Sequence, residues 1–230
     1  MGLRTLAPLV DVVVVVDVLS FTTCVDVALG RGAVLFPYPW RDGSEGAFAE
    51  SVGAVVASRQ RDAEFSLSPA SLEKIPAHTR LVLPSPNGSA LLFGAVDAGA
   101  TTAVAACIRN GAAIGSWFAD QDVTVGVIAA GERWGQGGTG PMRVALEDLW
   151  GAGCVLSLFA PDDLSPEARM AANAWRAAER HIVTELEGCS SGRELIGIDH
   201  AHDVALAGAA HVSELVPALN DGCFVDLAAG

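Results

Sequence analysis

The sequence predicts an α/β protein with three layers, in which helices cover both faces of a mostly parallel, or else mixed, central sheet. Residues 12–16 are five consecutive valines, and such a run is typical of a parallel strand buried on both faces. Strand-like segments then alternate with helix-like ones, as βαβ units do. With 230 residues, the chain is long enough to build a sizeable core. We therefore expect one domain over 1–230, with any sub-lobe boundary near 160–164.

The remaining elements follow from apolar runs and from helix start and stop signals. A polar turn after the first strand leads into a helix that ends at Gly30. Later strands are predicted at 33–36, 53–57, 80–83, 102–105 and 123–130. Helical patterns cover 87–98, 110–119 and 141–159.

The last third of the chain predicts a different, mainly helical pattern. One long amphipathic helix is expected over 165–187, opened by Ser165 as N-cap and Pro166 at N1 and ended by Gly188. Further helices are predicted to start near Ser190 and to cover 199–209, and short strands are predicted at 214–216 and 223–226.

Composition excludes several classes of protein. The net charge of −13 argues against binding nucleic acid through an overall basic surface. No apolar run approaches the ~20 residues that cross a membrane, and the apolar start leads straight into the first strand instead of forming a signal peptide. The five cysteines are scattered without a C-x-x-C pair, which excludes a zinc ribbon and favours reduced thiols. We expect a cytoplasmic protein without nucleic-acid or membrane partners.

Asp17 lies where the first strand should end. Thr22 and Thr23 follow where the next helix should begin, with its unpaired backbone N–H groups and positive dipole end. Ligands of open α/β sheets bind outside the carboxyl ends of the strands. This carboxylate could therefore hold a metal or attack phosphorus beside groups that bind an anion, while the simpler alternative is a helix cap.

A second polar turn follows the strand at 80–83. Here Asn87 offers side-chain hydrogen bonds, and Gly88 lets the backbone come close to a ligand. Phosphate binding and plain helix capping both fit this pattern.

Glu132 and Arg133 follow the strand at 123–130, where Glu132 could ligate a metal and Arg133 could bind an anion. Asp148 lies beside Glu147 on the helix that follows, and only one of these two acids should face the site. An acid buried there needs a metal or an arginine as its neighbour, and two solvated acids remain the alternative.

The segment 135–140 matches the G-x-G-x-x-G pattern of dinucleotide-binding proteins. Glu132, Arg133 and Trp134 separate it from the preceding strand, whereas the dinucleotide motif follows its strand at once. A glycine-rich lid over a site is the better interpretation. Near the C-terminus, Arg193 is a candidate anion ligand, and the i, i+2 spacing of His200 and His202 argues against a two-histidine metal site.

An ordered set of short motifs along the chain resembles the 2-phosphosulfolactate phosphatase family of coenzyme M biosynthesis. The similarity runs from about residue 10 to 226 and comprises DVLSFTT, Ser68-Pro69, PNGS, Arg109-Asn110, AGE, LEDLWGAG, SGREL and DVALA…VP. The resemblance implies an α/β/α, Mg²⁺-dependent phosphatase that releases phosphate from phosphosulfolactate and related 2-phospho-hydroxy acids.

The resemblance also marks positions in this chain that look functional. They are Asp17, Thr22, Thr23, Asn87, Gly88, Asn110, Glu132, Asp148 and Arg193. One departure is Ser20 with Phe21, where the family usually has D-V-L-R-A-T-T. Losing an arginine there puts the sulfonate-bearing substrate in doubt.

The leading hypothesis is Mg²⁺-assisted hydrolysis of a small anionic phosphate monoester. Two or three of Asp17, Glu132 and Asp148 would hold the metal, which fits the few carboxylates that Mg²⁺ takes. Thr22, Thr23, Asn87 and Gly88 would hold the phosphate, and Arg193 or Arg109, beside Asn110, would hold the substrate's carboxylate or sulfonate.

Alternatives remain open at this stage. Asp17 could be the nucleophile or only a metal ligand, although Leu19 stands where the haloacid dehalogenase pattern needs a second acid. A family member that binds small anions without catalysis, and a dinucleotide-dependent oxidoreductase, are the rival functions. A homodimer is expected only from base rates.

Overall fold

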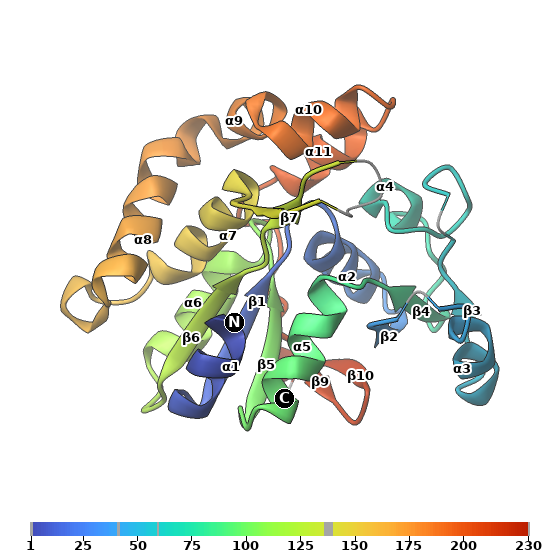
Figure 1. The fold of residues 1–230 in the computed structure, drawn as a ribbon, viewed down its shortest axis with the longest axis horizontal. Coiled ribbons are helices and arrows are strands. Elements are labelled where there is room, and N and C mark those ends of the chain that lie inside the picture. Colours follow the sequence, from blue (N-terminus) through green and yellow to red (C-terminus); the bar gives the residue numbers. More distant parts are fainter. Residues whose placement is uncertain (1, 41, 59, 136–139, 230) are drawn as a thin grey trace.

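The valine run forms β1 (Val12–Val16), which lies inside the main sheet between β5 and β6 (Figure 1). This computed structural model describes residues 2–40, 42–58, 60–135 and 140–229. On its two sides β1 pairs in parallel with β5 (Thr102–Ala106) and β6 (Val125–Ala129). Each of its five valines is nearly or fully buried, as the unbroken β-branched run predicts.

The sheet is mixed because an antiparallel hairpin extends its edge. β9 (Pro217–Asn220) pairs antiparallel with β5, and β10 (Cys223–Asp226) pairs antiparallel with β9. A second, parallel sheet has the order β2-β4-β3, formed by Val34–Tyr38, Arg80–Pro84 and Val55–Val56, and β2 lies against β10. The predicted α/β class with a mostly parallel sheet is confirmed.

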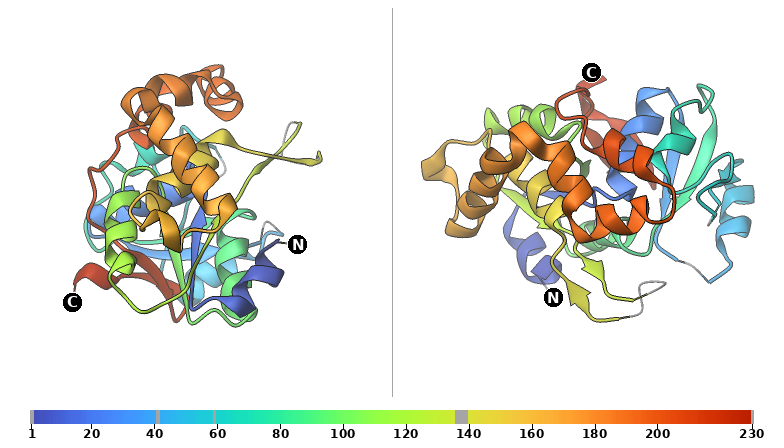
Figure 2. Two further views of the ribbon diagram at one scale, coloured as in Figure 1. Left: turned by 90° about the vertical axis from the view of Figure 1, so that its left-hand side faces the viewer. Right: turned by 90° about the horizontal axis from the view of Figure 1, so that it is seen from above.

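Alternate side chains of β1 enter two separate hydrophobic cores, and this produces the layers. Val12, Val14 and Val16 pack on the face covered by α6 (Gly111–Ala119), α7 (Leu146–Leu156) and α8 (Pro166–Ala178). Val13 and Val15 pack on the opposite face, covered by α2 (Phe21–Gly30) and α5 (Gly88–Asp97). Figures 1 and 2 show the sheet between these two groups of helices. The three-layer prediction is therefore confirmed.

Three short helices lie at the end of the molecule where β1 and β6 finish, at the top of Figure 1. They are α9 (Ile182–Gly188), α10 (Ser190–Ile196) and α11 (Ala201–Ala207). α11 packs on α4 (Pro69–Leu72), which follows the second sheet's β3. The remaining elements are α1 (Gly2–Leu6), η1 (Ala7–Leu9), α3 (Glu45–Ser51), β7 (Glu132–Arg133), β8 (Met142–Arg143), η2 (Pro161–Asp163), η3 (Glu179–His181) and η4 (Leu227–Ala229).

The predicted helix over 141–159 is wrong at both ends. Met142 and Arg143 pair with Arg133 and Glu132 to make the hairpin β7–β8, and the helix begins only at Leu146. Ala145, its N-cap residue, is still extended (φ −103°, ψ 117°). The pairing with β7 takes these residues out of the helix.

The long helix predicted over 165–187 is interrupted. Its start is confirmed, because the Ser165 hydroxyl accepts the Ala168 N–H and Pro166 is the first helical residue, and its end at Gly188 is confirmed too. In between, α8 gives way to the 3-10 turn η3 before α9 begins. The buried positions Ala178, Ile182 and Leu186 keep a helical spacing across the turn, so the pattern could not reveal the interruption.

Three smaller expectations were also wrong. The N-terminus forms α1 and η1 before β1 instead of leading straight into the strand. The strand predicted at 214–216 is non-strand chain, and β9 starts afterwards at Pro217, an accepted position for proline in a strand. Helices α3 and α4 lie in a part of the chain where none was predicted.

The segment 160–164 holds η2 between α7 and α8. Val155 of α7 and Trp175 of α8 belong to the same core, so the packing continues across this segment. Within the described ranges, every helix is too short or too polar to pass through a lipid bilayer.

Candidate active site

Asp17 lies in a cleft of about 350 Å³ at the carboxyl end of β1. The cleft also receives the residues that follow β6, which is parallel to β1 and ends at the same edge of the main sheet, and the residues that follow β4 of the second sheet. Its lining residues are Asp17, Leu19, Ser20, Arg61, Leu67, Ser85, Pro86, Asn87, Gly131, Glu132, Arg133 and Met142. The structure therefore brings together the predicted residues Asp17, Asn87 and Glu132.

Gly88 brings the start of α5 up against Asp17. A Cβ at position 88 would lie 2.2 Å from a Phe21 ring carbon and 2.7 Å from the Asp17 Oδ2 atom. Only glycine allows this approach. Asn87 does not cap the helix with its side chain; its Nδ2 instead donates to the Gly131 carbonyl at 2.9 Å, which ties the turn after β4 to the turn after β6.

Asp148 links the turn after β1 to the turn after β6 through hydrogen bonds. Its Oδ1 accepts the Val18 N–H at 2.8 Å, and its Oδ2 accepts the Gly131 N–H at 2.9 Å. The side chain is buried on the first turn of α7, where the positive end of the helix dipole favours an acid. Both Glu147 and Asp148 are buried, so the alternative of two solvated acids is wrong. Asp148 bonds to turns of the cleft, whereas Glu147 Oε2 lies 3.5 Å from Cys189 Sγ.

The site brings buried carboxylates and other acidic side chains close together. Burial, together with the charges of Glu132 and Glu147, raises the pKa of Asp17 from 3.8 to about 7, while the backbone amides of Gly88 and Phe21 oppose the rise. Burial and the neighbouring Asp17 and Glu147 also raise the pKa of Asp148 well above its usual range. Positive charge that enters the cleft would favour the ionised form of Asp17 and lower its pKa.

Glu132 and Arg133 reach the cleft from β7. Their strand pairs with β8, so the glycine-rich segment between Arg133 and Met142 links two strands of a hairpin. A dinucleotide motif links a strand to a helix, so this connection does not fit one. The predicted lid falls on 135–140, of which residues 136–139 lie outside the described part of the chain.

Arg61 is a cleft residue that the sequence did not single out. Its Nη1 lies 3.0 Å from Asp203 Oδ2, and its Nη2 donates to the Ser20 hydroxyl at 3.2 Å. Asp203 itself is fully buried on α11, and its Oδ1 accepts the Ser68 hydroxyl at 2.6 Å and the Ala70 N–H at 3.0 Å. The Ser68-Pro69 and DVALA motifs are thus joined by the bond from Ser68 to Asp203, and Asp203 also pairs with Arg61.

The two threonines are buried and bond to the chain between β1 and α2. The Thr22 hydroxyl donates to the Asp17 carbonyl at 2.8 Å and accepts the Asp17 N–H at 3.1 Å. The Thr23 hydroxyl donates to the Val18 carbonyl at 2.7 Å. Neither is among the lining residues of the cleft. These contacts fix the backbone that carries Asp17.

Arg109, Asn110 and Arg193 lie away from the cleft lining. Arg109 Nε lies 2.7 Å from Asp26 Oδ2, and its Nη1 donates to the Leu206 carbonyl, so it links α2 to α11. Asn110 is buried and accepts the Cys107 N–H at 2.8 Å in the turn after β5. Arg193 is exposed on α10.

The donor set of the cleft fits a cation held by few protein ligands. Asp17 and Glu132 both line it, and their mutual repulsion is one cause of the raised Asp17 pKa. Within the described residues, no three His, Cys, Asp or Glu side chains are arranged to share one ion. Mg²⁺ is commonly bound through one or two carboxylates, with waters and substrate phosphate completing its shell. The residues present therefore fit Mg²⁺ with two carboxylates.

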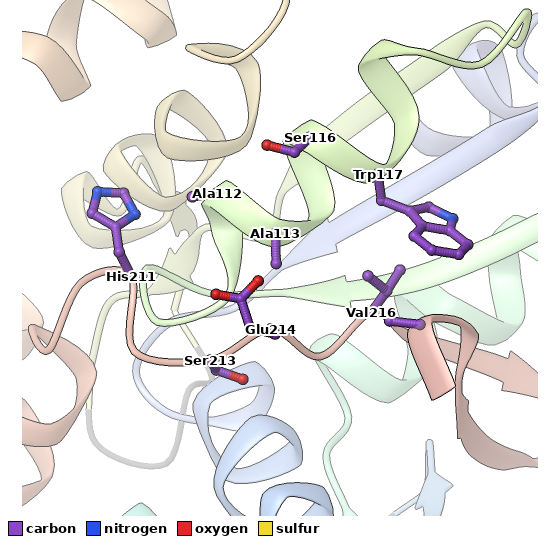
Figure 3. Close-up of a pocket in the computed structure, with 9 residues that line it drawn as sticks. Ala112, Ala113, Ser116, Trp117, His211, Ser213, Glu214 and Val216 are labelled. Carbon is purple, nitrogen blue, oxygen red and sulfur yellow. The ribbon is translucent and has the colours of Figure 1, made fainter. Parts of the chain in front are cut away.

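A second hollow, of about 500 Å³, lies between α6 and the segment 211–216 (Figure 3). His211, Glu214 and Trp117 stand around it, and the described residues that line it include no predicted site residue. The Nε2 atom of His211 lies 3.0 Å from the Oε1 atom of Glu179. This hollow lacks the buried carboxylates that mark the cleft at Asp17.

Comparison with known proteins identifies a family for this chain. The family model described as 2-phosphosulpholactate phosphatase matches residues 4–222, which is nearly the whole chain. A search of curated proteins found no significant match. The family's name describes a phosphoric monoester hydrolase, an enzyme that acts on a small phosphate ester. The chain belongs to the 2-phosphosulpholactate phosphatase family.

Proposed function

We propose that this protein hydrolyses a small 2-phospho-hydroxy acid, 2-phosphosulfolactate or a close relative, with Mg²⁺ as its cofactor. Water and the ester would give the hydroxy acid and inorganic phosphate. The observation that carries the proposal is the pairing of buried Asp17 with Glu132 in a cleft whose other walls offer amide and guanidinium groups. Such a site suits a dianionic phosphate that arrives with a divalent cation.

Asp17 and Glu132 are the residues that would hold Mg²⁺. When bound, the ion would neutralise charge on the phosphoryl group and orient the attacking oxygen. Asp148 supports this pair from outside the cleft, because both of its oxygens accept backbone N–H groups of the turns that carry Asp17 and Glu132. We therefore narrow the three carboxylates expected from sequence to two ligands and one positioning residue.

The phosphate would lie against the turn at Asn87 and Gly88. The start of α5 presents backbone N–H groups there, and the absence of a side chain at Gly88 keeps this turn beside Asp17. Arg133, at the rim, adds a positive charge. Thr22 and Thr23 would act through the backbone, by holding the turn that carries Asp17.

The experiment is a screen for phosphate release from a panel of monoesters. Purified protein would be incubated with 2-phosphosulfolactate, 2-phospholactate and simple alkyl phosphates, first with MgCl₂ and then with excess EDTA. Release that requires Mg²⁺ and favours the 2-phospho-hydroxy acids would support the proposal, and a place in coenzyme M biosynthesis would follow if phosphosulfolactate ranks first. No release of phosphate from any ester by folded protein would overturn it in favour of an anion-binding role without turnover.

A further inference from the structure

We propose that Arg61 is the specificity-determining residue of the cleft and binds the substrate's second anionic group, a carboxylate or sulfonate oxyanion. This rests on the proposed function for the identity of the phosphate-bearing ligand. It replaces Arg109 and Arg193, which the sequence favoured for this role, because neither of them lines the cleft.

The position of the Arg61 side chain is fixed by an ion pair with a buried carboxylate. Its partner Asp203 is completely buried and is itself fixed by Ser68 and by the Ala70 N–H. Ser66 also donates a hydrogen bond to the Arg61 carbonyl at 2.8 Å. An arginine restrained at its backbone and at both Nη atoms loses little further freedom when it binds a ligand, so more of the interaction energy appears as affinity.

The guanidinium still has donors to offer. It carries five N–H groups, and Asp203 and Ser20 engage one at each Nη atom. The side chain is 22% exposed, and it lines the same cleft as Asp17. Because Arg61 borders the cleft, its remaining N–H donors are available to a ligand there. The planar guanidinium matches the paired oxygens of a carboxylate or sulfonate.

Ser20 fixes where the second anion would lie. It follows Asp17 by three residues in the turn that leads into α2, and its hydroxyl accepts the Arg61 Nη2 bond at 3.2 Å. The guanidinium is thereby tied to the turn that carries Asp17. In a 2-phospho-hydroxy acid, the carboxylate is attached to the carbon that bears the phosphate, so a cation beside the phosphate site is where this group needs it.

The test measures binding instead of turnover, so that it stands apart from the test of hydrolysis. Three phosphonates of equal chain length would be titrated by calorimetry in buffer with MgCl₂: 3-phosphonopropanoate, 2-phosphonoethanesulfonate and propylphosphonate. Wild-type protein should bind one or both of the doubly anionic probes about 10- to 100-fold more tightly than propylphosphonate, the size of a charge-assisted hydrogen bond. The probe with the larger preference shows which oxyanion Arg61 favours at the spacing that separates phosphate and carboxylate in a 2-phospho-hydroxy acid.

Arg61→Met should abolish this preference and leave propylphosphonate affinity within about threefold of wild type. Arg61→Lys keeps a charge beside Asp203, protects the fold, and should lose part of the preference in the same selective way. Arg180→Met, at an exposed position in η3, is the matched control and should change none of the three affinities. The proposal is overturned if wild type shows no preference for the anionic probes, if the folded Arg61 variants keep the wild-type preference, or if they lose as much affinity for propylphosphonate as for the anionic probes.

Discussion

Asp17 is a carboxylic acid in surroundings that disfavour its charged form. The end of β1 buries its carboxyl group next to Glu132, and both burial and repulsion favour the protonated form. A protein selected for stability alone would place an uncharged residue here. A carboxylate kept in such surroundings is typical of a site that performs chemistry.

Asp17→Asn should therefore make the metal-free protein more stable above neutral pH. The pKa of Asp17 is about 7 in the folded protein and 3.8 as the reference value for an unperturbed side chain. Between these values, the folded state holds a proton that the unfolded state has released, so the stability of the wild type falls as pH rises from about 4 to 7. The variant lacks this loss and should exceed wild type by roughly 2–4 kcal/mol at pH 8, and by a smaller margin of about 1–2 kcal/mol at pH 5.

Urea unfolding in EDTA at pH 5 and pH 8 measures this difference. Asp120→Asn, at an exposed position after α6, is the control and should follow wild type at both values. A variant that is less stable than wild type at pH 8 would contradict the electrostatic account of Asp17.

Gly88→Ala should damage both stability and phosphate binding. The added methyl group would overlap the Phe21 ring and press on Asp17 Oδ2, so the start of α5 must move. We expect a loss of about 1–3 kcal/mol in unfolding free energy and a rise in KM, measured by urea unfolding and by steady-state phosphate release. Gly46→Ala, where a Cβ meets nothing within 4 Å in helix α3, should cost nothing. Equal KM values for Gly88→Ala and wild type would refute this role of the turn.

At the scale of elements, one buried carboxylate of α11 bonds to the segment that follows β3 of the second sheet. Asp203 accepts bonds from Arg61, Ser68 and Ala70, which all lie between β3 and the end of α4. Asp203→Ala would leave the arginine without its anion and two further donors without their acceptor.

The expected cost of Asp203→Ala is about 3–5 kcal/mol of unfolding free energy, measured by chemical denaturation. Glu187→Ala, at an exposed position of α9, should cost less than about 0.5 kcal/mol. A cost for Asp203→Ala as small as that of the control would mean that this anchor does not hold α11.

The sequence predicted those elements whose pattern reflects burial. The valine run foretold β1, and β2, β4, β5 and β6 appear within a few residues of their predicted places. The errors arose where long-range pairing or bending decides the structure. The pairing of Arg133 with Met142 ended a predicted helix early, and the turn η3 bends a helix whose apolar spacing continues unbroken.

The same distinction applies to the site. Asp17, Asn87 and Glu132 were predictable because each follows a recognisable strand, and strand ends converge. Arg61 was not predictable, because it is one of 14 basic residues and its partner Asp203 lies 142 residues further along the chain. The roles of Thr22, Thr23, Arg109, Asn110 and Arg193 as ligands of the substrate stay predictions from sequence.

At the scale of the whole molecule, the cleft is assembled from segments that span most of the chain. Asp17, Arg61, Asn87 and Glu132 come from four separate segments of the chain, and Asp203 of α11 supports Arg61 from a fifth. A ligand that binds all of these together binds only the folded state. Its binding should therefore stabilise the entire protein.

Mg²⁺ with inorganic phosphate should raise the melting temperature of the wild type. At ligand concentrations of about 100 times Kd, the gain is about 2.7 kcal/mol, or roughly 5–10 °C for a chain of this size. Differential scanning fluorimetry measures it, with CaCl₂ and with phosphate alone as comparisons. The shift should disappear in Glu132→Gln, and an undiminished shift in that variant would place the ions elsewhere on the protein.

The central claim is that Asp17 and Glu132 support Mg²⁺-dependent release of phosphate from a 2-phospho-hydroxy acid. The most direct test is the rate of phosphate release from 2-phosphosulfolactate and 2-phospholactate at saturating Mg²⁺, compared between wild type and folded Asp17→Asn. We predict turnover by wild type that EDTA abolishes, and a rate at least about 1000-fold lower in the variant, equivalent to about 4 kcal/mol of transition-state stabilisation. Full activity of Asp17→Asn would contradict the account.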